Sequence, residues 1–524
     1  MTLLRPPTLL HELPLQAALR TPHAIALVEG AQQIDYATLA TRIEALAGGL
    51  LARGLARGER VAIWMEKRSE LVCSVFASSL AGAVFVPINP QLKPAQVAHI
   101  LQDCGVSLLI TTTARLPLLA PVLADCPALR EALCVDAADG SWAALQAAGT
   151  GQPPRIIDAD LACIFYTSGS TGRPKGVMVS QRNLVVGAQS VASYLDNRAD
   201  DCLLAALPLS FDAGFSQLTT AFAVGARVVL LNYLMPRDVL NAMAREQVTG
   251  LTAVPPLWMQ LATLNWPEAA SQSLRYFAST GGRMPIPTLQ ALRERVPAAK
   301  PFLMYGLTEA FRATYLPPEE AARRPDSIGR AIPNTEVLVL REDGSECAVD
   351  EPGELVQRGA LVTLGYWNDA AKTAERYRPL PLRAGQTQAE IAVFSGDTVR
   401  RDAEGFLYFI GRRDEMIKTS GYRVSPTEVE EACHATGLVA EVAALGVEHP
   451  ALGQAIVLVA CPASGRDCTA ASLLAALRTQ LPGWMLPAHI ELCSTALPRN
   501  PNGKIDRVQL AQSFAGLFSA AAPH

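Results

Sequence analysis

The chain carries, from position 166, the run Tyr166-Thr167-Ser168-Gly169-Ser170-Thr171-Gly172-Arg173-Pro174-Lys175-Gly176. Glycine adopts backbone conformations that other residues avoid, so successive N–H groups in such a run can converge on the oxygens of a phosphate. Hydrogen-bond donors come from the hydroxyls of Thr167, Ser168, Ser170 and Thr171, and a positive charge comes from Lys175. This composition predicts a phosphate-binding loop.

Apolar runs flank the loop on both sides. Residues 161–165 precede it and residues 177–179 follow it, and each run has the length and composition of a buried strand. A Walker-type loop would need a Gly-Lys-Ser/Thr triplet that opens a helix, and neither Gly169 nor Gly172 supplies the required spacing. A flexible Ser/Gly linker would not be expected between buried strands. We therefore expect a strand–loop–strand phosphate clamp and not an ordinary P-loop.

Strands and helices alternate over most of the chain. Short apolar strands such as residues 61–64 are separated by Ala/Leu-rich helical stretches such as residues 36–55, and the same texture recurs over residues 200–301. This alternation predicts an α/β fold with parallel sheets. Gly and Asp-Gly turns over residues 328–366 indicate a small β-rich subdomain.

The length of 524 residues, half of them apolar, exceeds one hydrophobic core, so we expect at least two domains. The first is a large, multi-subdomain α/β domain over residues 1–411. The second is a small α+β domain over residues 412–524, which begins with the charged stretch Arg412-Arg413-Asp414-Glu415.

Composition excludes several functional classes. The net charge is -4, with 45 basic and 49 acidic residues, which gives no electrostatic footprint for nucleic acid or an anionic membrane. Apolar runs are far shorter than the roughly 20 residues that span a bilayer. The amino terminus lacks the apolar core and cleavage site of a secretory signal, so a cytoplasmic location is expected.

Cysteine and histidine usage argue against two further kinds of site. The 11 cysteines are odd in number and form no Cys-x-x-Cys pair, which argues against a disulfide framework or a zinc site. None of the 7 histidines lies between His99 and His434, so a Ser-His-Asp arrangement would need a base from the chain ends.

Five further segments combine residues that suit one nucleotide site, although each alone is a weak signal. An Asp after Gly is usually a turn residue, and Asn-Gly-Lys is usually a hairpin tip. The segments are Thr280-Gly281-Gly282, Tyr305-Gly306-Leu307-Thr308-Glu309, Phe394-Ser395-Gly396-Asp397, the stretch from Gly411 to Lys418 with Ser420 to Arg423 after it, and Leu497 to Arg507.

Together, in this order and spacing, the segments resemble the adenylate-forming superfamily of acyl-CoA synthetases, amino-acid adenylation domains and luciferases. The resemblance covers about Leu15 to Gln512. It implies a large amino-terminal domain joined by a hinge to a small mobile carboxy-terminal domain, with ATP and Mg²⁺ as cofactors.

The resemblance also implies roles for the matching residues. The β- and γ-phosphates of ATP would be held by the loop from Thr167 to Lys175, including Gly169 and Gly172. Nucleotide contacts would come from Gly281, Gly282 and Gly306, adenine stacking from Tyr305, α-phosphate contact from Thr308, magnesium binding from Glu309, ribose binding from Asp397 and Arg412, hinge motion from Asp414, and contact with the α-phosphate and substrate carboxylate from Lys504.

The chemistry of the reaction is compatible with these roles. A carboxylate that attacks the α-phosphate brings two anions together, so the site needs magnesium and a cation such as Lys504. A single carboxylate such as Asp397 can accept hydrogen bonds from both ribose hydroxyls.

The substrate signal lies in Phe211, Asp212 and Phe215. Many fatty and aryl acyl-CoA synthetases carry a histidine where this chain has Phe211-Asp212, a pair that looks like amino-acid adenylating enzymes whose Asp binds the substrate ammonium. A carboxylate in an apolar pocket needs a cationic partner, which a substrate amine would supply. Alternatively, Asp212 caps a following helix over residues 215–223. Pocket candidates Phe215, Trp258 and Phe311 could equally be core.

As a whole the chain also resembles stand-alone acyl-CoA ligases associated with bacterial exosortase and exopolysaccharide systems. No carrier domain follows Lys504, so we expect the thiol to come in trans, from CoA or from a separate carrier protein. The sequence thus predicts an AMP-forming acid–thiol ligase of the acyl-CoA synthetase type, with an amino-acid activator as the alternative. A regulatory nucleotide-binding protein without catalysis is disfavoured by Lys175, Glu309 and Lys504.

Overall fold

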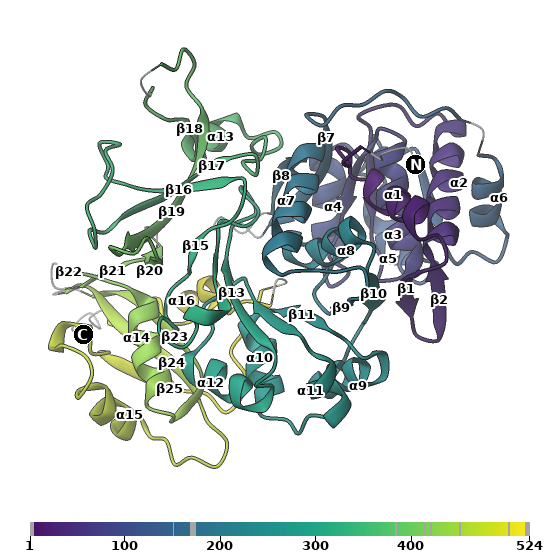
Figure 1. The fold of residues 1–524 in the computed structure, drawn as a ribbon. Helices are drawn as coiled ribbons and strands as arrows, with labels where there is room; N and C mark the ends of the chain where they lie inside the picture. The colour runs from purple at the N-terminus through teal and green to yellow at the C-terminus, as the bar shows by residue number, and fades with distance from the viewer. Residues whose placement is uncertain are drawn as a thin grey trace.

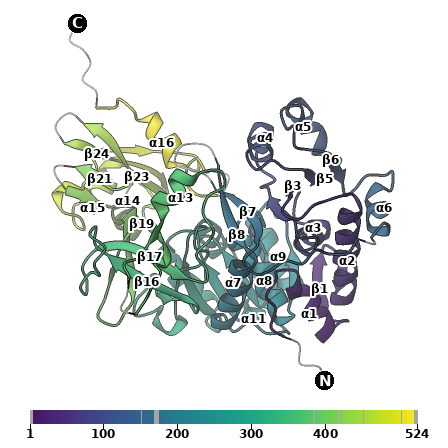
Figure 2. The ribbon, with the colours of Figure 1, turned by 90° about the horizontal axis from the view of Figure 1, so that it is seen from above.

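The computed structural model describes residues 5–149, 151–167, 174–382, 385–412, 415–419, 422–449, 452–500 and 503–518. Strands within these ranges form four sheets, and the chain runs from an amino-terminal lobe (purple and blue in Figure 1) through a central lobe to a carboxy-terminal unit (light green and yellow; Figures 1 and 2). The predicted class, a large α/β domain with several sheets and a small α+β carboxy-terminal domain, is confirmed.

The amino-terminal lobe contains a sheet whose described strands have the order β6-β5-β3-β4-β7-β8. Its strands are β3 (Arg60–Ile63), β4 (Val84–Pro87), β5 (Leu108–Thr111), β6 (Glu131–Cys134), β7 (Leu161–Thr167) and β8 (Lys175–Ser180). Its helices are α1 (Glu12–Arg20), α2 (Tyr36–Ala52), α3 (Ser69–Leu80), α4 (Pro94–Asp103), α5 (Leu116–Leu123) and α6 (Ser141–Ala147). Helical crossovers make the first four strands parallel, as the alternating texture predicts.

The two strands of the predicted phosphate clamp are present. β7 and β8 pair antiparallel, and Thr167 lies opposite Lys175 in their register. The predicted strand–loop–strand form is therefore confirmed for its two strands. The loop residues themselves lie outside the described residues: Ser168, Gly169, Ser170, Thr171 and Gly172.

A second, larger sheet extends from the amino-terminal lobe through the central lobe, and its described strands have the order β15-β14-β13-β12-β11-β9-β10-β1-β2. The strands are β1 (Ile25–Glu29), β2 (Gln32–Asp35), β9 (Cys202–Ala205), β10 (Arg227–Leu230), β11 (Gly250–Ala253), β12 (Tyr276–Ser279), β13 (Lys300–Tyr305), β14 (Thr314–Leu316) and β15 (Arg330–Ala331). The helices are α7 (Gln181–Tyr194), α8 (Asp212–Val224), α9 (Pro236–Glu246), α10 (Pro255–Ala262), α11 (Glu268–Ser273) and α12 (Ile286–Arg295). In the order of the sheet, each neighbouring pair of strands from β13 to β1 is parallel.

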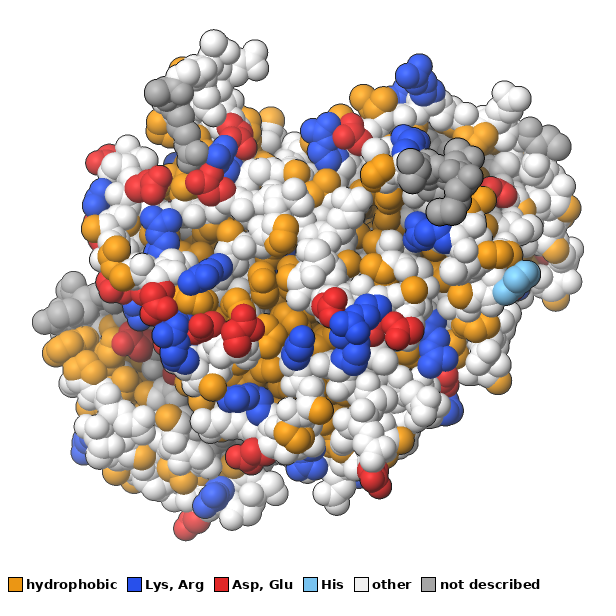
Figure 3. All heavy atoms as spheres, in the orientation of Figure 1, with side chains coloured by type: hydrophobic (Ala, Val, Ile, Leu, Met, Phe, Trp, Pro, Cys, Tyr) orange, Lys and Arg blue, Asp and Glu red, His pale blue; other side chains and the backbone are white. Residues whose placement is uncertain are grey.

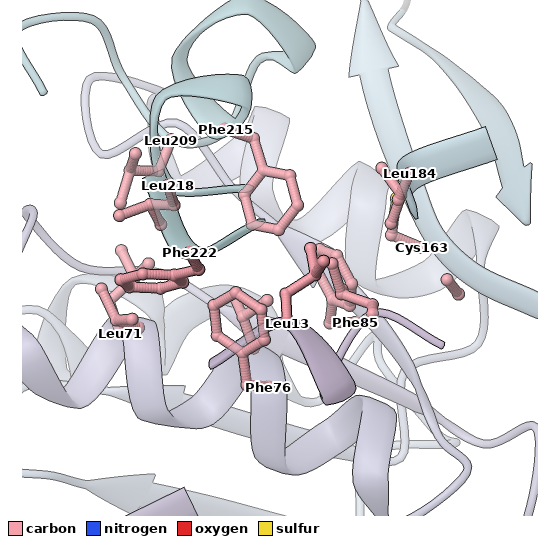
Figure 4. Close-up of a cluster of buried hydrophobic side chains, with 14 of the residues drawn as sticks. Leu13, Leu71, Phe76, Phe85, Cys163, Leu184, Leu209, Phe215, Leu218 and Phe222 are labelled. Carbon is pink, nitrogen blue, oxygen red and sulfur yellow. The ribbon is translucent and has the colours of Figure 1, made fainter. Parts of the chain in front are cut away.

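Aromatic side chains from both lobes share one hydrophobic core. The ring of Phe215 on α8 lies 6.4 Å from Phe76 on α3 and 5.4 Å from Phe85 on β4, centroid to centroid (Figure 4). Phe222, about two turns further along α8, lies 5.4 Å from Phe76. Each buried aromatic removes a large apolar area from water, so this cluster joins the two sheets firmly.

Two smaller sheets complete the fold. One has the order β16-β17-β19-β18 with β20 beside β19, and the other has the order β22-β21-β24-β23 with β25 beside β24. The bounds are β16 (Thr335–Leu340), β17 (Gly353–Gly359), β18 (Tyr377–Pro379), β19 (Ile391–Arg401), β20 (Leu407–Arg412), β21 (Ile417–Thr419), β22 (Tyr422–Val424), β23 (Val439–His449), β24 (Gly453–Pro462), β25 (His489–Leu492), α13 (Ala370–Arg376), α14 (Pro426–Ala435), α15 (Ala470–Leu477) and α16 (Arg507–Ser513).

The chain changes sheets between Arg412 and Ile417. The domain boundary predicted between residues 411 and 412 lies at the amino-terminal edge of this interval and stays a prediction. Asp414, the predicted hinge, lies outside the described residues. Across the junction, Arg283 after β12 forms an ion pair with Glu431 on α14, so the carboxy-terminal unit rests against the central lobe.

The surface agrees with the balanced composition. Figure 3 shows Lys and Arg side chains interspersed with Asp and Glu across the visible face. Among the helices that the structure describes, none combines the length and the apolar content needed to cross a bilayer.

Candidate functional site

The predicted motifs meet at one edge of the central sheet. Asp212, Gly281 and the segment from Tyr305 to Glu309 each follow the carboxyl end of a parallel strand, namely β9, β12 and β13. In open α/β sheets the crevice outside these strand ends is the usual ligand site. The sequence motifs are therefore far apart in the chain but adjacent in space.

Asp397 and Arg412 face each other beside Tyr305, at the end of β13. They are register partners on β19 and β20, and the Arg412 Nε lies 3.5 Å from the Asp397 Oδ1. The Tyr305 hydroxyl donates a hydrogen bond to the other Asp397 oxygen. Burial raises the pKa of the Asp397 carboxyl above its usual range, while the Tyr305 hydrogen bond and Arg412 oppose that shift. The three residues assigned to the nucleoside are thus in contact.

Tyr305 is held at both ends. Its ring packs against Phe409 at 6.3 Å between centroids, and burial next to Asp397 raises its pKa well above the ordinary value. The neighbouring Gly306 lies so close to the Phe311 carbonyl that a Cβ there would collide with it. Glycine at this position therefore allows the backbone after β13 to pass close to the Phe311 carbonyl.

Glu309 lies on the far side of the same turn. Its carboxylate accepts a hydrogen bond from the Tyr366 hydroxyl at 2.5 Å, and its backbone carbonyl accepts one from the Thr363 hydroxyl at 2.8 Å. The Lys175 ammonium lies 5.8 Å from the centre of the Tyr366 ring. Tyr366 thereby connects Lys175, from the phosphate clamp, to Glu309, the predicted magnesium ligand.

A cation cluster of three side chains lies near Tyr366 and Glu309: Lys175, Lys372 and Arg376. Of these, the sequence predicted only Lys175. Burial lowers the pKa of Lys175, and the charge of Lys372 on α13 lowers it further. Arg376, at the end of α13, donates to the Phe394 carbonyl at 3.2 Å and acts electrostatically on both Asp397 and Tyr366. Convergent cations suit a triphosphate, because phosphate oxygens carry several negative charges.

Gly396 makes room for Arg376. Its φ is +73°, in the left-handed region, and a Cβ there would collide with the Arg376 guanidinium. The glycine before Asp397 therefore has a packing function that the sequence showed only as a turn signal.

Lys504 reaches the site from the carboxy-terminal unit. Its backbone N–H donates to the Asn500 side chain at 3.1 Å, in a turn where Gly503 has φ +76°. Burial by the surrounding protein lowers the pKa of Lys504, and the charge of Arg412 lowers this pKa further. The charges of Asp212 and Asp397 raise it. Part of the lysine side chain still faces solvent. The lysine thus lies within electrostatic reach of both carboxylates.

Asp212 has a partner in the structure that neither interpretation given above anticipates. It is the first residue of α8, whose N-cap is Phe211, and it makes no capping hydrogen bond, so the helix-cap interpretation is wrong. Its carboxylate is paired with Arg312 at 3.2 Å, and the Arg312 side chain is only 3 % exposed. The cationic partner that the sequence assigned to a substrate amine is therefore supplied by the protein.

Three aromatic pocket candidates belong to the core. Phe215 is 1 % exposed within the cluster of Figure 4, so its predicted contact with substrate is not what the structure shows. Trp258 is fully buried and donates to the Ala278 carbonyl at 3.0 Å. Phe311 packs against Gly187 with a positive φ of 58°. Apolar residues near a motif carry no signal that separates core from pocket.

The remaining predicted residues border the crevice. Thr308 lies in the turn after β13, beside Glu309, and is partly exposed. Gly281 has φ +79°, which only glycine adopts without strain, and Gly282 follows it next to Pro255. Their backbone is thus free of side chains at the carboxyl end of β12.

The described residues fit a nucleotide-bound magnesium ion. Over the part of the chain that the structure describes, His, Cys, Asp and Glu side chains form no cluster of three or more that could hold a metal. Mg²⁺ in nucleotide sites commonly takes one or two protein carboxylates and completes its shell with phosphate oxygens and water. Glu309, beside the cation cluster, would be that carboxylate.

Comparison with known proteins identifies the family. The AMP-binding enzyme family matches residues 15–367, and the AMP-binding enzyme C-terminal domain matches residues 428–504. The chain belongs to the AMP-binding, adenylate-forming family. It is therefore an ATP-dependent adenylate-forming ligase, and the predicted membership is confirmed.

Relatives within the family differ in their acceptors. The chain is 32% identical over 509 residues to a feruloyl-CoA synthase of Amycolatopsis, covering 96% of this chain and 98% of that protein. It is 32% identical over 524 residues to an L-proline–[L-prolyl-carrier protein] ligase of Pseudomonas fluorescens, covering 97% and 100%. The o-succinylbenzoate CoA synthetase of Bacillus subtilis, solved with ATP and magnesium, superposes with a TM-score of 0.81 at 28% identity, covering 95% and 98%.

Proposed function

We propose that this ligase activates a carboxylic acid that lacks an α-amino group and transfers the acyl group to the thiol of CoA. The observation that carries the proposal is the pairing of Asp212 with Arg312. An Asp that already neutralises a protein cation has little charge left for a substrate ammonium. The family's CoA-dependent members, such as the feruloyl-CoA synthase, support the same choice of acceptor.

In the first half-reaction, an oxygen of the substrate carboxylate attacks the α-phosphorus of ATP, and pyrophosphate leaves. Bound magnesium would reduce the negative charge on the phosphates. Lys504 would offset the charge that develops between the two reacting anions, since the charges of Asp212 and Asp397 act on its ammonium group. Lys175 and Arg376 would hold the departing phosphates, and Tyr305, Asp397 and Arg412 would orient the nucleoside.

In the second half-reaction, the sulfur of CoA attacks the acyl carbonyl and AMP leaves. The thiol needs a path to the acyl-adenylate for this step, and family resemblance assigns that path to rotation of the small domain about Asp414. Members that load carrier proteins use the same chemistry, so an amino-acid activator is the second candidate. The similarity to a prolyl-carrier-protein ligase favours that candidate.

An ATP–pyrophosphate exchange assay with matched acids tests the proposal. Each acid is compared with its α-amino derivative at equal concentration, with and without CoA. We expect exchange with the plain acids and acyl-CoA formation when CoA is added. Exchange with α-amino acids alone would overturn the proposal. The narrower resemblance to exosortase-associated ligases stays a prediction. The substrate assay does not test it.

A further inference from the structure

A narrow cavity lies behind the segment from Tyr305 to Glu309. Met304 and Arg312, which flank that segment, both line the cavity, and so does Ala213, next to Asp212. The cavity has about 310 Å³ of space free of protein atoms, its opening included, but the part that water can enter is about one water molecule in size. It runs between helices α7 and α8 and strands β9 and β11 to β13, and its remaining lining residues are Val191, Leu195, Leu203, Ser216, Gln217, Thr220, Gly250, Thr252 and Tyr276.

Gln217 brings an unused amide into this cavity. Its side chain is only 5 % exposed, and neither Oε1 nor Nε2 has a hydrogen-bond partner within the ranges that the structure describes. The Nε of Arg312 is in the same condition. Proteins pair nearly all buried polar atoms, because an unpaired one loses its hydration without compensation. A donor and an acceptor left together in a cavity next to the site are therefore available to a polar group of a ligand.

The charges at the cavity restrict what that group can be. The Arg312 guanidinium is compensated by Asp212, so the pair as a whole carries no net charge. An ammonium or a second carboxylate placed beside it would be a buried charge without a counter-ion. A neutral group that both donates and accepts matches the two free positions of Gln217 without adding charge.

We propose that the acid activated here is short and carries a neutral hydrogen-bonding group, a hydroxyl or a carboxamide, on its tail. Gln217 binds that group, and the compensated Arg312–Asp212 pair forms the polar wall beside it. The inference rests on the proposed carboxylate-activating function. A long alkyl tail does not fit the narrow cavity. It would also leave the Gln217 amide buried without a hydrogen-bond partner, and sites built to form a hydrogen bond with the substrate strongly disfavour analogues that cannot form it.

A matched set of acids tests the proposal on the wild-type enzyme by ATP–pyrophosphate exchange. The set is butanoate, γ-hydroxybutanoate, succinamate, succinate, γ-aminobutanoate and, as a long alkyl acid, dodecanoate. We expect kcat/KM for γ-hydroxybutanoate or succinamate to exceed that for butanoate by about a hundredfold. The charged acids and dodecanoate should fall below butanoate. Equal or better activity with butanoate, dodecanoate or a charged acid would overturn the proposal.

A variant locates the effect at Gln217. Gln217→Met keeps the length of the side chain but removes its hydrogen bonds, so the preference for the hydroxylated acid should be lost. The KM for ATP should not change. Gln272→Met on α11, an exposed glutamine, is the matched control. A Gln217→Met enzyme that keeps its preference would show that the amide only holds a structural water, and would contradict the inference.

The two proposals fail in different ways. Absence of exchange with every carboxylate tried would count against the carboxylate-activating function itself. Exchange with alkyl acids but no preference for polar tails would leave that function intact and remove the substrate inference. If Gln217→Met does not fold, the wild-type series still decides, because its expected order needs no variant.

Discussion

The Arg312 guanidinium donates from Nη1 to the Asp212 carboxylate at 3.2 Å, across 100 positions of sequence. Asp212 opens α8 and Arg312 follows β13, so the ion pair joins two of the strand ends that form the site. A carboxylate there has two routes to neutrality, a substrate cation or a protein cation. In the structure the cation is Arg312 of the protein, so the expected substrate needs no amine.

The pair should show strong coupling in unfolding experiments. Arg312→Met alone leaves a largely buried carboxylate unpaired, and Asp212→Asn alone leaves a buried guanidinium unpaired, so each should cost about 3–5 kcal/mol. The double variant should cost clearly less than the sum, since it removes both charges. Chemical denaturation of the four proteins measures the coupling. Simple additivity would mean that the two side chains do not depend on each other.

Freeing Asp212 should also change the substrate preference. In Arg312→Met the carboxylate lacks its cation, so acids that carry an amine should gain activity relative to the wild type. Arg312→Lys, which keeps a cation, should not show this gain. Pyrophosphate exchange with γ-aminobutanoate and γ-hydroxybutanoate measures the ratio. An unchanged ratio in Arg312→Met would separate Asp212 from substrate recognition.

Lys504 should act on the first half-reaction. Lys504→Ala removes a cation that acts on charge developing in the transition state, so adenylate formation should slow by about a hundred- to a thousandfold. Thioester formation from chemically prepared acyl-adenylate should continue near the wild-type rate. Equal losses in both steps would make the lysine structural.

Tyr305 and Asp397 should affect nucleotide binding more than turnover. Asp397→Ala removes ribose acceptors remote from the reacting bond, so the KM for ATP should rise by about 5- to 100-fold while kcat changes little. Tyr305→Phe keeps the ring and removes only the hydrogen bond to Asp397, so its effect should be smaller. Steady-state kinetics at varied ATP distinguish the two. Collapsed kcat with unchanged KM would contradict this placement.

His11 should make the protein sensitive to acid. Its side chain is 7 % exposed, contacts Ser79 at 3.1 Å, and burial lowers its pKa to about 4, with Glu12 opposing the shift. The unfolded chain binds the proton at about pH 6.5 and the folded chain only near pH 4, so the unfolded state holds more protons between these values. Stability should therefore be complete above about pH 6.5 and fall as the pH drops, by about 3 kcal/mol at pH 4.

Replacing His11 tests that sign. His11→Asn should lose less stability than the wild type between about pH 7 and pH 4.5. His23→Asn is a suitable control, because the His23 side chain is 91% exposed. A His11→Asn protein with the same acid dependence as the wild type would refute the assignment.

Sequence patterns predicted the fold well where apolar runs were unambiguous. The strand at Tyr276–Ser279 and the paired strands β7 and β8 follow directly from such runs and from turn residues between them. The motifs around Tyr305 and Asp397 also meet as predicted. Local pattern carries information about strands because burial of alternate or continuous side chains is a local property.

The acid-binding end of the site was harder to predict. Phe215 is apolar and lies beside Asp212, but only packing against Phe76 and Phe85 shows that it is core. Arg312 and Gln217 depend on contacts between helices and strands distant in sequence, and no local signal announces them. Only the three-dimensional structure shows which charges pair over long sequence distances and which buried amides lack a partner.

Formation of acyl-CoA tests the central claim most directly. The wild-type enzyme is incubated with ATP, magnesium, γ-hydroxybutanoate and CoA, and AMP, pyrophosphate and acyl-CoA are measured together by mass spectrometry. The account predicts one acyl-CoA and one pyrophosphate for each AMP released, with γ-hydroxybutanoate preferred over γ-aminobutanoate. Adenylate that forms only with amino acids and passes only to a pantetheine carrier protein would contradict it.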